Sequence, residues 1–351
     1  MPPLDLNLPP ELAELVPPLT TPDPRECPPL RWGIIGPGGI AHKFARNVAS
    51  ATACRVTAVA SRERERAERF AHEHGIPAAV EGYGTLAERE DVDAVYVATP
   101  HSAHRDAALL AIAAGKHVLV EKAFTRNAAE AREVVAAARE AGVFCMEAMW
   151  TRFLPRHVVA RHLVRSGLVG DVVQIVADHG QPLTHIPRLV RPELAGGALL
   201  DLGVYPISFI VGLLGRPDAV DAFGHLWETG VDVSSVTHLT YPGASGVATT
   251  TMLAPTPTRA FVGGTDGWIA LDTPFYGPGG LEVLRRGWEA PVRWSGVPDD
   301  GGFEFQVAEA ARCVAEGLTE SPVLPLDETV AIMEIMDAVR ASLGVRFPGE
   351  G

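Results

Sequence analysis

A glycine-rich segment between an apolar run and a helical pattern constrains the fold of this chain most. The run Trp32-Gly33-Ile34-Ile35 has the composition of a buried strand, and Gly36-Pro37-Gly38-Gly39-Ile40-Ala41 follows it directly. This order of strand, tight turn and helix start matches the dinucleotide-binding fingerprint, in which glycines let the backbone approach a pyrophosphate. Such turns also occur without a ligand, but a second strand follows here in the expected order. The turn is therefore predicted to bind a dinucleotide at a helix start, whose free N–H groups favour phosphate.

Short β-branched runs then alternate with alanine-rich and charged helical segments, as in the βαβ units of a parallel sheet. The sequence predicts strands at 31–35, 55–60, 94–98, 117–120 and 143–146. It predicts helices at 40–50, 63–74, 102–114 and 127–141. Residues 30–150 are accordingly interpreted as a Rossmann domain, a doubly wound parallel sheet of the α/β class.

The pattern changes after Trp150. A helix is predicted at 155–166, strands at 171–178, 219–227, 233–241, 246–253, 260–263 and 268–271, and two more helices at 303–316 and 327–342. Strands joined by Gly, Pro or Asp turns indicate an antiparallel sheet. We expect residues 151–351 to form a substrate-binding α+β domain with a large, mainly antiparallel open sheet. Such a sheet needs one face covered, which predicts a homodimer, with helices of the same chain as the alternative cover.

Composition excludes several classes of protein. With 43 acidic against 30 basic side chains the formal charge is −13, which argues against nucleic acid or an anionic membrane surface as a partner. The longest apolar stretch, residues 204–214, is about half of the ~20 residues that a bilayer span needs. The four cysteines lack zinc-knuckle or redox-dithiol spacing and no export signal is recognised, so a cytoplasmic protein with reduced thiols is expected.

Residues 1–29 contain ten prolines and are expected to form a mobile tail or a surface strap.

The end of the second predicted strand indicates which dinucleotide binds. Val59-Ala60-Ser61-Arg62 has no acid where NAD-preferring proteins hold the ribose hydroxyls. The Ser61 hydroxyl and the guanidinium groups of Arg62 and Arg66 suit the 2′-phosphate of NADP(H). The alternative is that this arginine-rich stretch is a salt-paired, solvated helix face. We predict NADP as the cofactor, with NAD as the alternative.

Polar residues lie at the carboxyl ends of later strands, where ligands bind in such sheets. In Thr99-Pro100-His101-Ser102-Ala103-His104, the two histidines lack a third zinc ligand and are interpreted as cofactor contacts or helix caps. The pair Glu121-Lys122 ends the next strand. Its lysine is one of only three in the chain and is expected beside the nicotinamide, with a surface cation as the alternative. The predicted cofactor contacts at this edge are Thr99, Pro100, His101, His104, Glu121 and Lys122.

Longer motifs give the chain a resemblance to a known family. Glu121-Lys122, Met146-Glu147-Ala148-Met149-Trp150-Thr151-Arg152-Phe153 and Gly196-Gly197-Ala198-Leu199-Leu200-Asp201-Leu202-Gly203-Val204-Tyr205 are similar to motifs of the Gfo/Idh/MocA oxidoreductases. Within the family the chain most resembles the dimeric trans-1,2-dihydrobenzene-1,2-diol dehydrogenases, also described as NADP-dependent D-xylose dehydrogenases. Thr184-His185-Ile186-Pro187-Arg188 and Glu320-Ser321-Pro322-Val323-Leu324-Pro325-Leu326 also resemble that group.

The resemblance implies the two-domain fold predicted above, pairing through the open face of the second sheet, and a catalytic centre with Lys122, Tyr205 and Asp201. A four-residue spacing puts Asp201 and Tyr205 on one face of a helix, which independently supports their placement. Trp150 and Arg152 are expected to line the nicotinamide end of the cofactor.

Three positions depart from the family pattern. Ala123 follows the Glu-Lys pair where proline is usual, and His179 and Trp227 stand where the group has other side chains around its diol pocket. The substrate is therefore expected only as a class, namely a small polyol, sugar or diol.

The implied reaction is reversible hydride transfer between nicotinamide C4 and a carbon that bears a secondary hydroxyl. Tyr205, with an ordinary pKa near ~10, accepts the hydroxyl proton only if a cation such as Lys122 lowers that value, and Lys122 itself is the alternative proton carrier. Asp201 is expected to orient the lysine or a substrate hydroxyl. No catalytic metal is expected, because the cofactor carries the redox chemistry.

Two other functions stay open. One is a different sugar reaction on this scaffold, such as anhydrofructose reduction or glucose–fructose oxidoreduction. The other is a non-catalytic sugar sensor that binds the dinucleotide, although a sensor has no reason to keep Lys122, Asp201 and Tyr205.

Overall fold

The computed structural model describes residues 3–299 and 301–350. These residues divide into two compact units. The first unit contains Pro22–Trp150 and residues 301–333, and the second contains Pro3–Thr21, Thr151–Asp299 and residues 334–350. The chain therefore returns to the first unit late, whereas the sequence analysis assigned all residues from 151 onward to the second domain.

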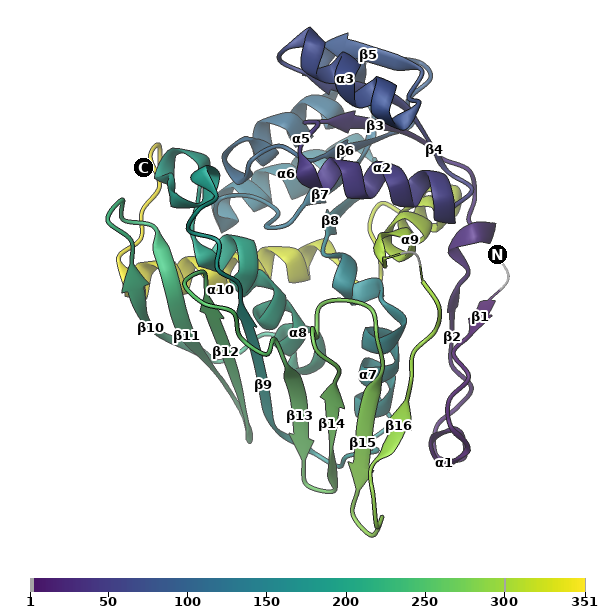
Figure 1. The fold of residues 1–351 in the computed structure, drawn as a ribbon, viewed down its shortest axis with the longest axis vertical. Coiled ribbons are helices and arrows are strands. Elements are labelled where there is room, and N and C mark those ends of the chain that lie inside the picture. The colour runs from purple at the N-terminus through teal and green to yellow at the C-terminus, as the bar shows by residue number, and fades with distance from the viewer. Residues whose placement is uncertain (1–2, 300, 351) are drawn as a thin grey trace. The chain divides into compact units, whose positions relative to one another are not determined.

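A parallel six-stranded sheet forms the centre of the first unit (Figure 1). Its strand order β5-β4-β3-β6-β7-β8 confirms the predicted Rossmann architecture. The strands are β3 (Arg31–Ile35), β4 (Arg55–Ser61), β5 (Ala78–Glu81), β6 (Ala94–Val97), β7 (His117–Glu121) and β8 (Cys145–Ala148). Strand β6 is wholly buried, because helices cover both faces of a parallel sheet.

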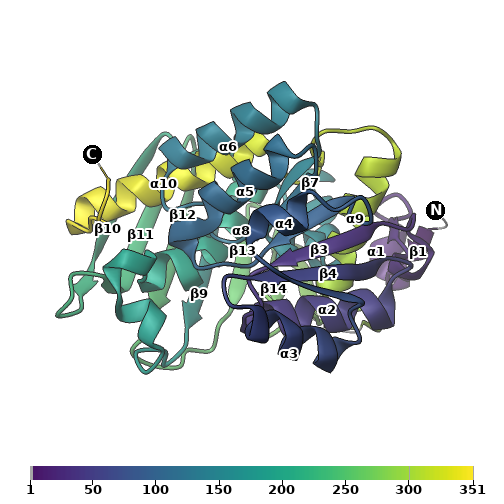
Figure 2. The ribbon, with the colours of Figure 1, turned by 90° about the horizontal axis from the view of Figure 1, so that it is seen from above.

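Helices α2 and α3 lie on one side of this sheet, and α5 and α6 lie on the other (Figure 2). The limits of α6 follow from its sequence: the Asn127 side chain accepts a hydrogen bond from the Glu130 N–H at 2.9 Å, and Gly142 ends the helix at φ 64°. Helix α9 also packs on α2, which explains why this late segment belongs to the first unit. The helices are α2 (Gly39–Ala51), α3 (Arg64–His74), α4 (Tyr83–Ala87), α5 (His104–Ala113), α6 (Ala128–Ala141) and α9 (Phe303–Ala315), with short turns η1 (Pro24–Glu26) and η2 (His101–Ala103).

An eight-stranded sheet forms the second unit, in the order β10-β11-β12-β9-β13-β14-β15-β16. Only the pair β12 and β9 is parallel, so the sheet is mixed and mainly antiparallel, as predicted. Buried residues alternate with more accessible, mostly half-buried ones along β11 and β12, because only one face of the sheet is packed against helices. The strands are β9 (Val172–Gly180), β10 (Ala219–Leu226), β11 (Asp232–Tyr241), β12 (Ala244–Thr251), β13 (Ala260–Gly264), β14 (Gly267–Leu271), β15 (Leu281–Arg285) and β16 (Val292–Trp294).

Helix α8 (Val204–Leu214) forms the core of the second unit against β9 and β12. Gly246 of β12 makes room for it, since a Cβ there would lie 2.6 Å from Cγ2 of Ile210. The stretch Pro192–Leu214 is long and apolar enough to cross a membrane, but 83% of its most apolar window is buried inside the protein, as in the core helix of a soluble protein. The other helical elements are α7 (Pro155–Arg165), η3 (Trp150–Phe153), η4 (Pro187–Val190), η5 (Pro192–Leu194), the π-helical η6 (Leu199–Gly203) and α10 (Leu326–Leu343), which runs through both units.

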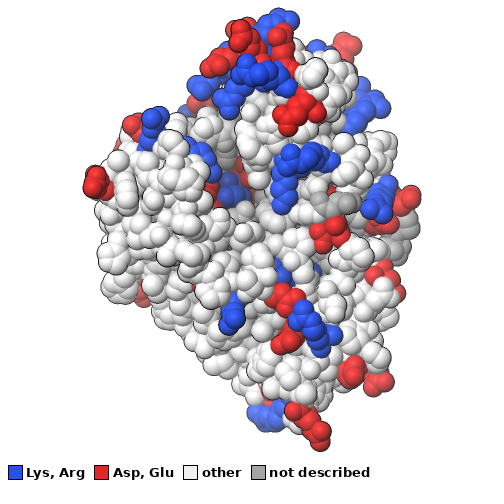
Figure 3. Space-filling model, in the orientation of Figure 1, with Lys and Arg blue, Asp and Glu red and all other residues white. Residues whose placement is uncertain are grey.

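The exposed face of this sheet carries large apolar side chains. Phe223 is 76% exposed and lies opposite Val236, which is 48% exposed, and Phe261 on β13 is 38% exposed. We call the face that carries these three side chains the open face. Figure 3 shows few charged side chains over β10 to β13, in contrast to the surface over α3.

The proline-rich segment at the start of the chain contains β1 (Pro3–Asp5), α1 (Pro10–Ala13) and β2 (Thr20–Pro22), and its two strands pair with each other. Leu6 and Leu12 are fully buried, and Nε1 of Trp294 donates a hydrogen bond to the Leu6 carbonyl oxygen at 2.7 Å. The segment is therefore packed onto β16 of the second unit.

Candidate active site

The turn between β3 and α2 has the geometry that a dinucleotide requires. Gly36 adopts φ +91°, and a Cβ there would lie 2.8 Å from the Ala98 carbonyl oxygen, so only glycine fits. A Cβ at Gly39 would meet nothing within 4 Å, which leaves that side of the turn open. Helix α2 begins here with no side-chain cap on Gly38, so its first N–H groups are available to a phosphate. Gly36, Pro37, Gly38, Gly39 and Ile40 thus form a cradle that fits the predicted ligand.

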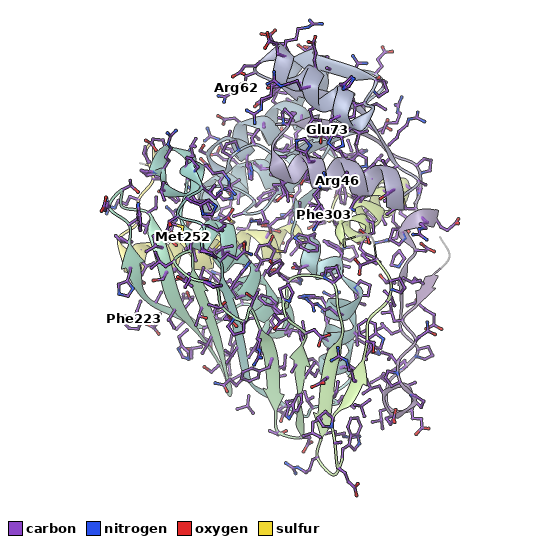
Figure 4. The ribbon with its side chains drawn as sticks, viewed as in Figure 1. Arg46, Arg62, Glu73, Phe223, Met252 and Phe303 are labelled. Carbon is purple, nitrogen blue, oxygen red and sulfur yellow. The ribbon has the colours of Figure 1, made fainter. Side chains whose placement is uncertain are left out.

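The end of β4 brings a cation to this turn. Nη2 of Arg66, in the first turn of α3, lies 3.5 Å from the Pro37 carbonyl oxygen. Ser61 is buried and its Oγ accepts a hydrogen bond from the Glu63 N–H at 3.2 Å, whereas Arg62 is exposed (Figure 4). The donor set of one hydroxyl and two guanidinium groups suits a phosphate better than a ribose diol.

The segment after β6 contains a buried polar atom without a partner. Oγ1 of Thr99 makes no hydrogen bond to any residue that the structure describes. The neighbouring His104 imidazole lies between two carbonyl oxygens, because Nε2 is 2.8 Å from that of Thr99 and Nδ1 is 2.9 Å from that of Ala123. Burial lowers the pKa of His104. This side chain therefore joins the segments after β6 and β7, with His101 buried and packed edge-on against it after Pro100.

Two buried carboxylates hold the backbone around Lys122. Glu121 accepts hydrogen bonds from the Tyr96 hydroxyl and, at 3.2 Å, from the Lys122 N–H. Glu147 at the end of β8 accepts one from the Phe124 N–H at 3.2 Å. The Lys122–Ala123 peptide is cis. Together with His104, these groups fix the chain on both sides of the lysine at the carboxyl edge of the sheet.

Trp150 and Arg152 belong to different units. Trp150 is buried against Phe303 in the first unit, and Nζ of Lys43 lies 4.1 Å from the Trp150 ring centroid. Arg152 belongs to the second unit, where Nη1 donates to the Ser208 carbonyl oxygen at 3.1 Å. Their role at the nicotinamide stays a prediction.

Asp201 and Tyr205 lie at the junction of η6 and α8 and are 7% and 8% exposed. Asp201 accepts a hydrogen bond from Nη2 of Arg188 at 3.0 Å, so the motif around Arg188 supplies its partner. The Tyr205 ring packs against the rings of His179 and Tyr276, with centroids 5.2 and 5.3 Å away.

The rings beside Tyr205 form a cluster that sequence reasoning did not find. His179 stacks on Tyr276 at 4.4 Å, and its Nδ1 lies 3.2 Å from the Leu202 carbonyl oxygen. Nε2 of Gln181 donates to the Tyr276 hydroxyl at 3.0 Å and lies 2.9 Å from Nε2 of His179. Nε2 of His179 accepts from the amide if Nδ1 carries the proton. The available signal was an aromatic pair, Phe275-Tyr276, in a Pro- and Gly-rich loop.

Trp227, the other departure from the family pattern, has a packing role. It lies against a buried apolar cluster that includes Leu202 and Met252, of which Figure 4 labels Met252.

Comparisons with known proteins identify the family. A family model described as an oxidoreductase family with an NAD-binding Rossmann fold matches residues 30–149, and the GFO/IDH/MocA C-terminal domain matches residues 157–270. Trans-1,2-dihydrobenzene-1,2-diol dehydrogenase of Macaca fuscata fuscata is 39% identical over 330 residues, which are 91% of this chain and 98% of that protein.

Two solved structures are similar over 90% of this chain. The 3-ketoreductase KijD10 of Actinomadura kijaniata, in complex with NADP and TDP-benzene, has 30% identity and a TM-score of 0.79 over 98% of its own chain. Aldose-aldose oxidoreductase of Caulobacter crescentus, complexed with glycerol, has 26% identity and a TM-score of 0.82 over 97% of its chain. With the cradle after β3 and the lysine after β7, these matches show that the chain belongs to the Gfo/Idh/MocA oxidoreductases and is an NAD(P)-dependent dehydrogenase.

Proposed function

We propose that the protein is an NADP(H)-dependent dehydrogenase that acts on a secondary hydroxyl of a sugar or cyclic trans-diol. The observation that carries this proposal is the pairing, within the first unit, of an open glycine cradle with a lysine whose flanking backbone is fixed by Glu121, Glu147 and His104. The relatives support the substrate class, because they are named as a dihydrodiol dehydrogenase, a 3-ketoreductase and an aldose-aldose oxidoreductase.

The residues around the cradle suit NADP(H). The N–H groups at the start of α2 would hold the pyrophosphate, and Ser61, Arg62 and Arg66 would hold the 2′-phosphate. The Thr99 hydroxyl is buried and has no partner among the described residues, and it would donate a hydrogen bond to the bound NADP(H). When bound, the cofactor supplies hydride transfer at nicotinamide C4.

The protein's own part of the reaction is to move the hydroxyl proton. Lys122 offers an ammonium that stabilises negative charge on the substrate oxygen, and Tyr205 offers a phenol that accepts or donates the proton. Asp201 acts as a positioning residue, with Arg188 fixing one of its oxygens at 3.0 Å. The ring cluster of His179 and Tyr276 holds the Tyr205 ring in place.

Replacement of the two proposed catalytic residues tests this function. Lys122→Met and Tyr205→Phe are each expected to reduce turnover by about 10²- to 10⁴-fold, because each removes a group that handles the proton. NADPH binding, followed by nucleotide fluorescence, should be nearly unchanged. Lys116→Met is the matched control: its Nζ donates to the Arg89 and Val92 carbonyl oxygens before β7 begins, so turnover should persist.

A substrate panel completes the test. NADPH formation is measured with D-xylose, D-glucose and a trans-dihydrodiol of benzene. Near-native turnover of either variant would remove that residue from the mechanism. Tight NADPH binding without turnover of any alcohol would favour the sensor instead.

A further inference from the structure

Two helices of the first unit bring three metal-binding side chains together. His42 lies on α2, and Glu73 and His74 lie at the end of α3. Nδ1 of His42 is 2.7 Å from Nε2 of His74 and 3.1 Å from Oε1 of Glu73, and the distance from His74 to Glu73 is 3.6 Å. Figure 4 labels Glu73 on α3 and Arg46 on the neighbouring α2.

These separations are close to those around a zinc ion. Bond lengths of about 2.0–2.2 Å place neighbouring ligand atoms of a tetrahedral site roughly 3.3–3.5 Å apart. The three observed distances lie on either side of that range, so small rotations about the side-chain bonds would admit the ion. A donor set of two imidazoles and one carboxylate favours Zn²⁺ over Mg²⁺ or Ca²⁺, which take oxygen ligands.

Packing holds the two imidazoles in place. The Phe70 ring packs against both of them, with its centroid 4.6 Å from that of His42 and 4.6 Å from that of His74. The His74 side chain is only 8% exposed, whereas that of Glu73 is 57% exposed and gives access from solvent.

We propose that His42, Glu73 and His74 bind one Zn²⁺ ion, with water as the fourth ligand. The site is separate from the dehydrogenase reaction and joins two helices that hold the dinucleotide, because α2 begins at the glycine cradle and α3 carries Arg66. The ion therefore stabilises the fold rather than the reaction. The positive charge of Arg46, on α2 with His42, should oppose the ion (Figure 4).

Zinc titration of the full-length protein, stripped with a chelator, tests the site. Calorimetry with ZnCl₂ should show one ion per chain and a melting temperature that rises by several degrees when zinc is in excess. His42→Gln and His74→Gln should weaken binding at least about tenfold to hundredfold. Arg46→Gln should tighten it. The matched control is His72→Gln, an exposed histidine on the same helix, which should bind zinc as the native protein does.

Glu73→Gln keeps the test decisive if a histidine variant fails to fold, because this residue is exposed. It should also weaken zinc binding, and with Co²⁺ in place of zinc it should give less of the intense visible absorption that we expect from a tetrahedral site in the native protein. No one-to-one binding, or equal affinity in the native protein, Glu73→Gln and the folded histidine variants, would overturn the proposal. Activity with NADPH is measured separately, so loss of the proposed function would not affect this outcome.

Discussion

Under the proposed function, Arg66 is the residue expected to discriminate most between NADP and NAD. Its guanidinium stands at the glycine cradle, 3.5 Å from the Pro37 carbonyl oxygen. Arg66→Ala should lower kcat/KM for NADP⁺ by about tenfold to hundredfold, because a hydrogen bond to a charged group contributes ~1.5–3 kcal/mol. The value for NAD⁺ should not change. Steady-state kinetics with both cofactors measures the effect, and Arg69→Ala, exposed on the same helix, is the control. Equal losses with both cofactors would contradict the assignment.

Asp232 makes the stability of the second unit depend on pH. It is buried, its Oδ2 accepts a hydrogen bond from the Leu199 N–H at 2.6 Å, and its Oδ1 has no partner among the described residues. Burial raises the pKa of Asp232 to about 6. The folded protein therefore holds this proton more tightly than the unfolded chain. The stability that this group contributes is fully present below about pH 4 and is lost as the pH rises through about 6.

Asp232→Asn should remove this dependence while it keeps an oxygen for the Leu199 N–H. Relative to the native protein, its free energy of unfolding should rise by about 3 kcal/mol between about pH 4 and pH 8. Urea denaturation at the two pH values measures the difference. Asp218→Asn, at an exposed position, should show no such change. If the free energies of unfolding of Asp232→Asn and the native protein differed by the same amount at both pH values, the role of Asp232 would be refuted.

At the scale of elements, the turn from β3 to α2 separates the folding role of glycine from its binding role. Gly36→Ala must move the Ala98 carbonyl and force φ +91° on alanine, which should cost about 1–3 kcal/mol of stability. Gly39→Ala meets no protein atom within 4 Å, so its melting temperature should match that of the native protein. Its Cβ enters the open side of the cradle, and NADPH affinity should fall. Melting curves and NADPH titration measure the two effects, and an unstable Gly39→Ala would contradict this separation.

The sequence predicted the elements with strong patterns and missed the weak ones. The buried run of β3 was found with its observed limits, because apolar residues bounded by a glycine turn leave little choice. Strand β5 and helix α4 were missed, since each is five residues or fewer and carries no clear periodicity. Strands β15 and β16 were missed because glycine and proline surround them.

Local sequence patterns do not predict contacts between residues that lie far apart in the chain. The glycine cradle and Lys122 were predicted from local motifs. The contacts that fix the backbone beside Lys122 were not predicted, because Glu147 and His104 come from segments that follow two other strands. The contact between Cys27 and Cys54, with sulfur atoms 3.6 Å apart, likewise depends on tertiary packing.

At the scale of the whole molecule, the open face predicts the assembly state. Phe223, Val236 and Phe261 are exposed on it with few charges nearby (Figure 3), and these apolar side chains favour burial against a second copy. Light scattering should give twice the chain mass of 37.3 kDa for the native protein. Phe223→Asp should give the single-chain mass, because it would bury an unpaired charge. Leu110→Asp, at an exposed position on α5, should remain dimeric. A monomeric native protein would exclude the dimer.

The late return of the chain to the first unit also affects how the protein is made. A nascent chain that has emerged only as far as Trp150 contains the six strands but lacks α9, which packs on α2, and Thr319, whose carbonyl accepts the Cys145 N–H at 3.0 Å. At ~5–20 residues per second, translation from there to α9 takes roughly 10–30 s. During that interval the ribosome holds a Rossmann sheet with an uncovered apolar surface. The glycine cradle is translated early, but helix α2, which begins there, is covered by α9 only after residues 303–315 have been made.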